Sequence, residues 1–449
     1  MTPITPGTSA TNPAPAPSGA ASPGAASAGA SPSGNAPAAA SAGKSLLIPE
    51  ASARPADDPI FALNGEAVRR QRAGESILNA TLGALMEDDG TLAVMPTVFE
   101  ALAAVPPVRA AAYAPIAGEP RFLAAVIRDL YGDGPLTARS VAAATPGGTG
   151  ALHHAVVNFL EPGQALLTTN YYWGPYKTLA QHTRRRVDTF PMFDGGGRFD
   201  TAAFEQALQR QVDAQGRSLV ILNTPCHNPT GYSLDDREWQ AVAGAVSAAA
   251  RRAPVALLID LAYARFGSGD PAGWVRHVER LTDSALLMVA WTASKTFAQY
   301  GARIGALVAT HADGEQLQRI GNALSFSCRG TWSNCNHLGM LAVTDLLENA
   351  ALRARADTER QRLRALLGER VTAFNALAPK AGLRYPRYEG GFFVTVFTPD
   401  AEAAARRMRE LGVYVVPLAG AVRVALCSTP ARDVPRLVDA LRQGVAAGG

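Results

Sequence analysis

The stretch that decides the fold is W-T-A-S-K at residues 291–295, which follows an apolar run over residues 284–290. An apolar run of this length, bounded by turn signals, predicts a buried strand. Such a strand would deliver the hydroxyl groups of Thr292 and Ser294, and then the amine of Lys295, to a single loop.

The lysine in this loop has the chemistry of a nucleophile. Burial at the mouth of an apolar sheet disfavours the charged ammonium, so the pKa of Lys295 should be lowered. A neutral amine attacks carbonyl groups, which makes Lys295 a candidate for a Schiff base. Arg303 would supply a fixed cation that holds a phosphate beside the two hydroxyls. Taken alone, a serine and a lysine after a strand are more often solvated surface residues, and the motifs elsewhere in the chain reverse that balance.

The composition is typical of a globular protein with large cores. Of 449 residues, 47% are hydrophobic and 18% are charged; this length predicts roughly two to three domains. The net charge of +4 is small and gives no sign of nucleic-acid binding. Four scattered cysteines without zinc spacing predict reduced thiols in a cytoplasmic protein and no metal site. No apolar stretch reaches the length of about 18 residues that a membrane helix needs.

The chain changes character near residue 45. Residues 1–44 are almost entirely Ala, Pro, Ser, Gly, Thr and Asn, which predicts a disordered tail that lacks the pattern of a signal peptide. Residues 45–92 are predicted to form an N-terminal arm and part of a small domain. Residues 93–346 are predicted to form a large domain, and residues 347–449 a long linking helix and the rest of the small domain.

Short apolar runs alternate with helical patterns over most of the remaining chain. We predict strands over residues 165–169, 219–223, 255–260, 285–290 and 304–309, and helices over residues 65–73, 201–213, 235–252 and 347–377. Strands of a smaller unit are predicted over residues 391–397, 414–417 and 422–427. Such alternation is typical of an α/β fold in which helices wrap a mostly parallel sheet.

A glycine-rich turn at residues 144–152 runs into an apolar helix. Backbone amides at a helix N-terminus, together with the hydroxyl of Thr149, bind phosphate well. The stretch is neither a dinucleotide fingerprint nor a P-loop, so an ordinary tight turn explains it equally well. His153 and His154 follow, but adjacent helical residues point about 100° apart, and we interpret them as structural residues.

Aromatic and amide side chains follow two predicted strands. Trp173 comes after the strand that ends at residue 169 and could stack on a planar ring, although a core aromatic explains it equally well. Asn228 lies in H-N-P-T-G at residues 227–231. Pro and Gly fix the backbone there, and the amide presents both a donor and an acceptor.

A carboxylate ends the next predicted strand. Burying the charge of Asp260 there is costly unless a cation is near, and a protonated pyridine nitrogen is one such cation. A helix N-cap is the alternative interpretation of Asp260. Tyr263 follows closely and could donate its hydroxyl to a ring oxygen.

Together these motifs resemble those of pyridoxal-phosphate enzymes of fold type I, in particular the class I aminotransferases of the aspartate and aromatic type. The resemblance covers residues 57–441 and rests on H-N-P-T-G at 227–231, D-L-A-Y at 260–263, and S-K at 294–295 followed by Arg303. It implies an α/β fold with a large domain around a mostly parallel seven-stranded sheet. It also implies a smaller α/β domain built from both chain ends, and a homodimer with shared active sites.

The resemblance implies pyridoxal 5′-phosphate as the cofactor and assigns its contacts. Lys295 would form the Schiff base and move the proton, with Asp260 and Tyr263 as the other catalytic residues. Asp260 would pair with the pyridine nitrogen, and Asn228 and Tyr263 with the oxygen on the ring. The remaining implied contacts are the stacking Trp173, the phosphate-binding Gly148, Thr149, Thr292, Ser294 and Arg303, and Tyr113, which would reach the phosphate of the neighbouring subunit.

The resemblance also implies the substrate contacts. Arg423 would bind the α-carboxylate of an amino acid, and Arg329 would reach across the dimer to a side-chain carboxylate. Asn228, Trp173 and Gly83 complete the implied set. The implied reaction is ping-pong transfer of an amino group between aspartate, glutamate or an aromatic amino acid and a 2-oxo acid such as 2-oxoglutarate.

The chain departs from the family pattern at a few positions. Pro175 and Tyr176 stand where the family usually has Asn and His, behind the carboxylate of Asp260. Cys335 and Asn336 replace a Pro-Pro pair after the loop that is expected to carry the cross-dimer arginine.

Two other functions stay open at this point. One is a β-lyase or decarboxylase on the same scaffold. The other is a regulator that senses ligand without catalysis. A regulator of this kind should carry a DNA-binding domain before the fold, whereas the leader here is low-complexity and uncharged.

Overall fold

The computed structural model describes residues 45–55 and 59–449. The predicted tail, residues 1–44, lies outside the described residues. Residues 45–55 contain the short helix α1 (Pro49–Ser52) and belong to a separate unit of the chain, whereas Asp57–Gly449 forms a single unit. Within the described residues, no helix is long and apolar enough to cross a membrane.

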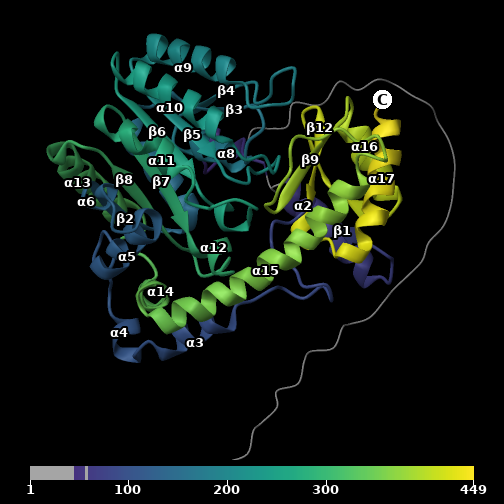
Figure 1. The fold of residues 1–449 in the computed structure, drawn as a ribbon, viewed down its shortest axis with the longest axis horizontal. Coiled ribbons are helices and arrows are strands. Elements are labelled where there is room, and N and C mark those ends of the chain that lie inside the picture. The colour runs from purple at the N-terminus through teal and green to yellow at the C-terminus, as the bar shows by residue number, and fades with distance from the viewer. Residues whose placement is uncertain (1–44, 56–58) are drawn as a thin grey trace, which may run out of the picture. The chain divides into compact units, whose positions relative to one another are not determined.

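Seven strands form the large sheet, in the order β2-β8-β7-β6-β5-β3-β4 (Figure 1). Their bounds are β2 (Ser140–Pro146), β3 (Ala165–Thr169), β4 (Arg186–Phe190), β5 (Ser218–Asn223), β6 (Val255–Asp260), β7 (Leu286–Thr292) and β8 (Ile304–Thr310). Strand β8 runs antiparallel to β2 and β7, and the other neighbours are parallel. The predicted α/β fold with a mostly parallel seven-stranded sheet is confirmed.

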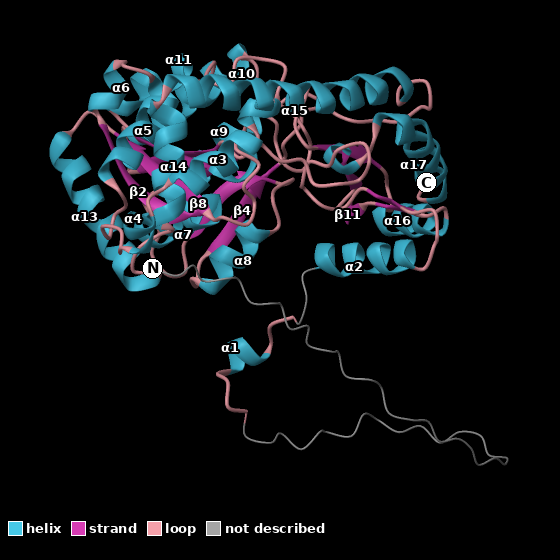
Figure 2. Cartoon of the chain, turned by 90° about the horizontal axis from the view of Figure 1, so that it is seen from below, coloured by secondary structure: helices cyan, strands magenta, loops and turns pink. Residues whose placement is uncertain are grey.

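Helices cover both faces of this sheet (Figure 2). The central strands are therefore buried along their whole length, which explains their continuous apolar sequences. One face packs against α7 (Gly147–Phe159), α8 (Pro175–His182) and α13 (Gly314–Thr331). The other face packs against α5 (Pro120–Tyr131), α9 (Thr201–Gln215), α10 (Asp236–Ala250) and α14 (His337–Glu348).

A second, smaller sheet follows the long helix α15 (Ala350–Leu377), which packs against α14 at one end and α17 at the other (Figure 1). Its order is β11-β12-β9, and all neighbours are antiparallel. Strand β1 pairs in parallel with β10, so both ends of the unit meet here. The bounds are β1 (Leu78–Asn79), β9 (Phe393–Phe397), β10 (Val413–Tyr414), β11 (Val416–Leu418), β12 (Ala421–Ala425), α16 (Ala401–Glu410) and α17 (Val434–Ala447).

The remaining helices connect these parts. They are α2 (Pro59–Arg72), α3 (Pro96–Ala104), α4 (Pro107–Ala111), α6 (Pro135–Ala138), α11 (Val275–Val278), α12 (Ala293–Thr296), and the 3₁₀ turns η1 (Ala264–Phe266), η2 (Glu279–Asp283), η3 (Leu426–Ser428) and η4 (Ala431–Asp433). The predicted domain boundaries at residues 92 and 346 stay predictions.

The structure adds two strands and corrects two of the predicted helices. Strands β2 and β4 were not predicted, because β2 is rich in alanine and β4 is a largely exposed edge strand. The helix predicted over residues 347–377 is two helices, since the side chain of Asn349 accepts hydrogen bonds from the amides of Ala351 and Leu352 and so starts α15. The helix predicted to start at residue 65 starts at Pro59, a residue favoured in a first turn.

Candidate active site

Most of the predicted cofactor residues meet in one cavity of about 180 Å³. The cavity lies where β5, β6 and β7 end in Asn223, Asp260 and Thr292, the edge at which open α/β sheets bind ligands. Its lining includes Gly148, Thr149, Trp173, Asn223, Asn228, Asp260, Tyr263, Thr292, Ser294, Lys295 and Arg303.

Asp260 presents a buried carboxylate to this cavity. One oxygen accepts a hydrogen bond from the hydroxyl of Tyr176 at 2.8 Å, and the other accepts one from the amide of Ala262 at 3.2 Å. Burial raises the pKa of Asp260, and these hydrogen bonds oppose the rise. No helix starts at Asp260, because the next one, η1, starts after Tyr263, so the N-cap interpretation is wrong.

Tyr176 occupies the position where the family pattern has a histidine. It lies on α8, is fully buried, stacks on Tyr172 with ring centres 6.2 Å apart, and meets Trp173 edge-on at 5.8 Å. Burial raises the pKa of Tyr176 well above its usual value. Asp260 therefore receives its hydrogen bond from a neutral phenol and not from a group that titrates near neutral pH.

Lys295 lies on α12, directly after β7. The hydroxyl of Thr292 caps this short helix by accepting from the amide of Ser294. The amine of Lys295 lies 5.2 Å from the ring centre of Tyr263 and 6.0 Å from that of Tyr300. Burial lowers the pKa of Lys295 to about 8, although the charge of Asp260 opposes the shift. A pKa near this value leaves roughly a tenth of the amine neutral at pH 7, which suits a nucleophile.

An anion site faces the amine from the start of α7. Its N-cap residue, Pro146, makes no side-chain hydrogen bond, so the first amides of the helix are not capped by that residue. Arg303 has a left-handed backbone (φ 54°), and its guanidinium donates to the carbonyls of Tyr300 at 2.9 Å and Pro146 at 3.2 Å. It also lies 3.4 Å from the hydroxyl of Ser294. Amides, a hydroxyl and a guanidinium together fit a phosphate.

Two glycines allow this close approach. A Cβ on Gly147 would lie 2.5 Å from Nη2 of Arg303, and a Cβ on Gly305 would lie 2.6 Å from the carbonyl carbon of Gly147. Larger residues at either position would push the arginine away from the helix start.

Arg423 connects the smaller sheet to the cavity. It lies on β12, is buried, and donates to the carbonyl of Thr81 at 2.6 Å and to the amide oxygen of Asn228 at 3.5 Å. Asn228 in turn donates to the hydroxyl of Tyr263 at 3.4 Å. The guanidinium lies 4.4 Å from the ring centre of Phe393.

Gly83 makes room for the same ring. A Cβ at this position would lie 2.5 Å from the ring of Phe393. The predicted substrate residues Arg423, Asn228, Trp173 and Gly83 therefore surround the cavity or support its wall.

Arg329 and Tyr113 lie outside the cavity of their own chain. Tyr113 is 91% exposed, and Arg329 is exposed with Nη1 donating to the hydroxyl of Ser333 at 2.7 Å. Arg329 lies in the last turn of α13, so the prediction that a loop carries it is wrong. Asn336 caps α14 and donates to the carbonyl of Ala302 at 2.9 Å, so a side chain provides the stiffening that two prolines would give.

Two site residues were missed by sequence reasoning. Asn223 accepts from the amide of Asn228 at 2.6 Å and donates to the carbonyl of Asp260 at 2.9 Å, so it joins two strand ends. Its place as the last polar residue of an apolar strand was a usable signal. Tyr300 accepts from the amide of Leu85 at 3.0 Å, a contact that no local pattern reveals.

The paired histidines serve packing. His154 is buried, stacks on Trp332 at 4.2 Å between ring centres, and has Nε2 3.3 Å from the sulfur of Cys328. Burial lowers its pKa to about 4, so it stays neutral. Within the described residues, no group of three metal-binding side chains comes together.

A lysine with a lowered pKa, a buried carboxylate and an anion site within one cavity indicate a site for a phosphorylated carbonyl compound. The family "Aminotransferase class I and II" matches residues 78–441. The chain belongs to this family. This confirms the predicted class, a pyridoxal-phosphate-dependent aminotransferase of fold type I.

Individual relatives agree with this assignment. The aromatic-amino-acid aminotransferase of Pseudomonas aeruginosa is 30% identical over 319 residues, which cover 69% of this chain and 76% of the relative. A crystal structure of an aminotransferase from Anaerococcus prevotii has 30% identity and a TM-score of 0.84, covering 90% of this chain and all of that one. The aromatic-amino-acid aminotransferase of Burkholderia pseudomallei, covalently bound to pyridoxal phosphate, has 25% identity and a TM-score of 0.73, covering 89% of this chain and 100% of that chain.

The residues of the cavity fit this cofactor. Asp260 is a buried carboxylate that needs a cation, as a protonated ring nitrogen would provide. Lys295 has a lowered pKa, so its amine suits a Schiff base with the aldehyde of pyridoxal phosphate. The start of α7 with Arg303 suits the phosphate.

Proposed function

We propose that the protein transfers amino groups between aspartate, glutamate or an aromatic amino acid and a 2-oxo acid such as 2-oxoglutarate. The observation that carries this proposal is the convergence of Lys295, Asp260 and the anion site in one cavity, with Arg423 at its side. Relatives named aromatic-amino-acid, tyrosine and aspartate aminotransferases support the choice of substrates.

Different side chains of this chain have different roles in the proposed reaction. Pyridoxal phosphate supplies an electron sink for the carbanion formed when a Cα–H bond breaks. Lys295 accepts the proton at its amine and returns it, a role for which a pKa near neutral is suited. Asp260 would keep a basic ring nitrogen protonated. Asn228 and Tyr263 would orient the ring through its oxygen.

The substrate is held from the side of the smaller sheet. The guanidinium of Arg423 presents parallel donors that match a carboxylate. Its hydrogen bonds to Thr81 and Asn228 fix its direction before substrate arrives, which reduces the cost of orienting the reacting Cα. Trp173 lines the cavity and can cover the face of a planar ring.

We also propose a cytoplasmic homodimer in which Tyr113 and Arg329 act on the partner's site. Support comes from the exposure of both side chains and from the family resemblance. The four cysteines are free, as expected of a reducing compartment. The proposed domains are a large one over residues 93–346 and a small one from residues 45–92 and 347–449.

A subunit-mixing experiment tests the shared sites. An inactive Lys295→Ala parent is exchanged with an Arg329→Ala parent, and dicarboxylate turnover is measured. Mixed dimers should regain one intact site and part of the activity. No recovery after verified exchange would show that each site is built within one chain.

An amino-donor panel with 2-oxoglutarate as acceptor tests the reaction itself. We expect glutamate to accumulate from at least one of aspartate, tyrosine or phenylalanine. Release of pyruvate or ammonia without amino transfer would instead assign a lyase and overturn the proposal.

A further inference from the structure

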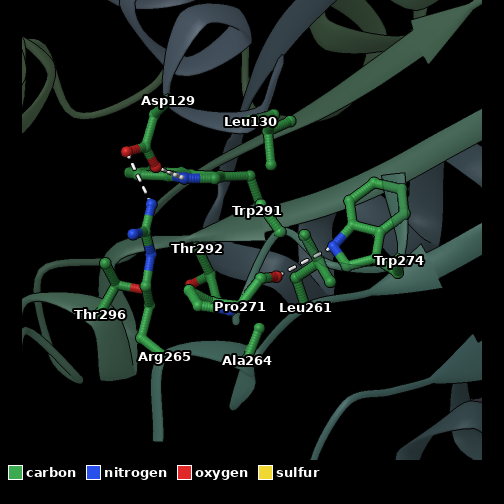
Figure 3. A pocket seen from close by; sticks show the side chains of 11 residues that line it. Asp129, Leu130, Leu261, Ala264, Arg265, Pro271, Trp274, Trp291, Thr292 and Thr296 are labelled. Atoms are coloured by element: carbon green, nitrogen blue, oxygen red, sulfur yellow. Dashed lines mark hydrogen bonds and ion pairs between the residues drawn. The ribbon is translucent and has the colours of Figure 1, made fainter. Parts of the chain in front are cut away.

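Asp129 lies outside the cofactor cavity but contacts two segments that build it. It is on α5, and its side chain is only 5% exposed. Oδ2 accepts a hydrogen bond from Nε1 of Trp291 at 3.1 Å, and Oδ1 accepts one from Nη2 of Arg265 at 2.8 Å (Figure 3).

The two donors belong to different halves of the site. Trp291 directly precedes Thr292 and the short helix with Lys295. Arg265 lies in η1, which directly follows Tyr263. A single carboxylate thus joins the segment after β6 to the end of β7, where Trp291 lies next to Thr292.

The position of the Trp291 indole affects the cofactor site through the backbone of β7. Trp291 packs against α5, and Thr292, the next residue, lines both the small cavity beside the indole and the cofactor cavity. The indole meets Phe122 edge-on at 6.0 Å and Phe297 at 6.4 Å. A shift of the indole therefore moves the backbone that carries the hydroxyl of Thr292.

Packing alone does not fix this indole. A small cavity of about 30 Å³ lies beside it, lined by Asp129, Arg265, Thr292 and Thr296 among others (Figure 3). This volume is enough for one water molecule, so the side chain has room to move when its hydrogen bond is lost.

The long helix α15 reaches the same place from a third direction. Arg353 has Nη2 3.4 Å from Oδ1 of Asp129. Arg360, two turns further on, donates to the carbonyl of Thr296 at 2.7 Å and lies 5.2 Å from the ring centre of Phe297. The segment around Lys295 is thus held on both sides.

We propose that Asp129 is a positioning residue for the cofactor site, because it sets the placement of the Thr292–Lys295 segment relative to Tyr263. The proposal rests on the proposed function, since it concerns the grip on pyridoxal phosphate. A merely structural Asp129 would stabilise the fold without a specific effect on that grip.

The test measures the dissociation constant of pyridoxal phosphate and the melting temperature of the apoprotein. Asp129→Asn should raise the dissociation constant by about tenfold, because an amide cannot hold both donors as a carboxylate does. Asp88→Asn is the matched control, since it removes a carboxylate 2.7 Å from the fully buried Arg370 in another part of the unit. The control should lower the melting temperature and change the dissociation constant by less than about twofold.

A second variant separates positioning from folding. Trp291→Phe removes the indole donor and leaves a smaller aromatic ring in place, and it should raise the dissociation constant by about fivefold. In the Asp129→Asn background Trp291→Phe should raise the dissociation constant by less than it does in the wild type, because both changes weaken the same hydrogen bond. Equal changes in Asp129→Asn and Asp88→Asn, or additive effects of the two site variants, would overturn the proposal. A wild-type chain that binds no pyridoxal phosphate would instead overturn the proposed function.

Discussion

The cofactor cavity and the surface that carries Arg329 differ in how completely one chain builds them. Asp260 and Asn228 in the cavity and Arg423 beside it are buried, and each is fixed by hydrogen bonds to neighbouring side chains or backbone. Arg329 and Tyr113 are exposed and lie outside it. The residues proposed to act on groups common to all amino acids therefore lie within one chain, whereas the proposed recognition of the substrate side chain needs a second copy.

Loss of the buried charge of Asp260 should lower the catalytic rate more than loss of Arg329 or of the Tyr176 hydroxyl. Asp260→Asn keeps the shape of the side chain but removes the carboxylate that is proposed to hold a ring nitrogen protonated. We expect kcat to fall by roughly a thousandfold with cofactor binding retained, since the anion site at Arg303 is untouched. Steady-state kinetics and a cofactor titration measure the two quantities, and near-normal turnover would count against this role of Asp260.

Loss of the exposed arginine should have a smaller and more selective effect. A charge-assisted bidentate pair contributes a few kcal/mol, so Arg329→Ala should lower kcat/KM for aspartate or glutamate by roughly a hundredfold. For aromatic substrates kcat/KM should fall by less than about tenfold, because these substrates present no second carboxylate. If both classes of substrate lose equally, Arg329 does not recognise a distal carboxylate.

Removing the phenol behind Asp260 should change rate and pH dependence together. The hydrogen bond from Tyr176 lowers the pKa of Asp260, so Tyr176→Phe should raise that pKa. Asp260 would then lose its charge at a higher pH as the solution is acidified, and the acid limb of kcat/KM should move upward, with about a tenfold loss of kcat. Tyr172→Phe is the control, since it removes a hydroxyl from the ring that stacks on Tyr176 and keeps the hydrogen bond from Tyr176 to Asp260. An unmoved acid limb in Tyr176→Phe would exclude this coupling.

The smallest expected effect is a shift in the reactivity of Lys295. In the apoprotein, reductive methylation of Lys295 should rise through a midpoint near pH 8. Asp260→Asn should lower that midpoint, because the carboxylate favours the charged amine, whereas Arg303→Gln should raise it, because the guanidinium disfavours that charge. Labelling of Lys177 and Lys380 in the same samples should respond to neither change. Shifts of the same sign in both variants would contradict the electrostatic account.

The residues of the buried cofactor cavity were predicted well from the sequence. The strands that end in Asp260 and Thr292 are continuous apolar runs, because both faces of the sheet are covered, and polar residues at their ends are conspicuous. The edge strand β4 and the alanine-rich β2 carry no such pattern and were missed. Tertiary contacts were also out of reach. Nothing local in the sequence indicates that Asp129 on α5 meets Trp291 or that Tyr300 meets Leu85.

Departures from the family pattern show a second limit of sequence reasoning. The departures at Tyr176 and Asn336 were visible in the sequence, but the contacts that these side chains make were not. The structure shows a phenol bound to Asp260 and an amide that links α14 to the carbonyl before Arg303. Both are geometric facts that residue types and spacing do not determine.

The most direct test of the central claim is borohydride reduction of the cofactor-loaded protein, followed by peptide mapping. The chain has few lysines, and of those in the described residues only Lys295 lines the cavity. The account predicts a pyridoxyl group on Lys295 and an absence of this label in Lys295→Ala. A pyridoxyl group on Lys177 or Lys380, or no label in protein shown to hold the cofactor, would contradict it.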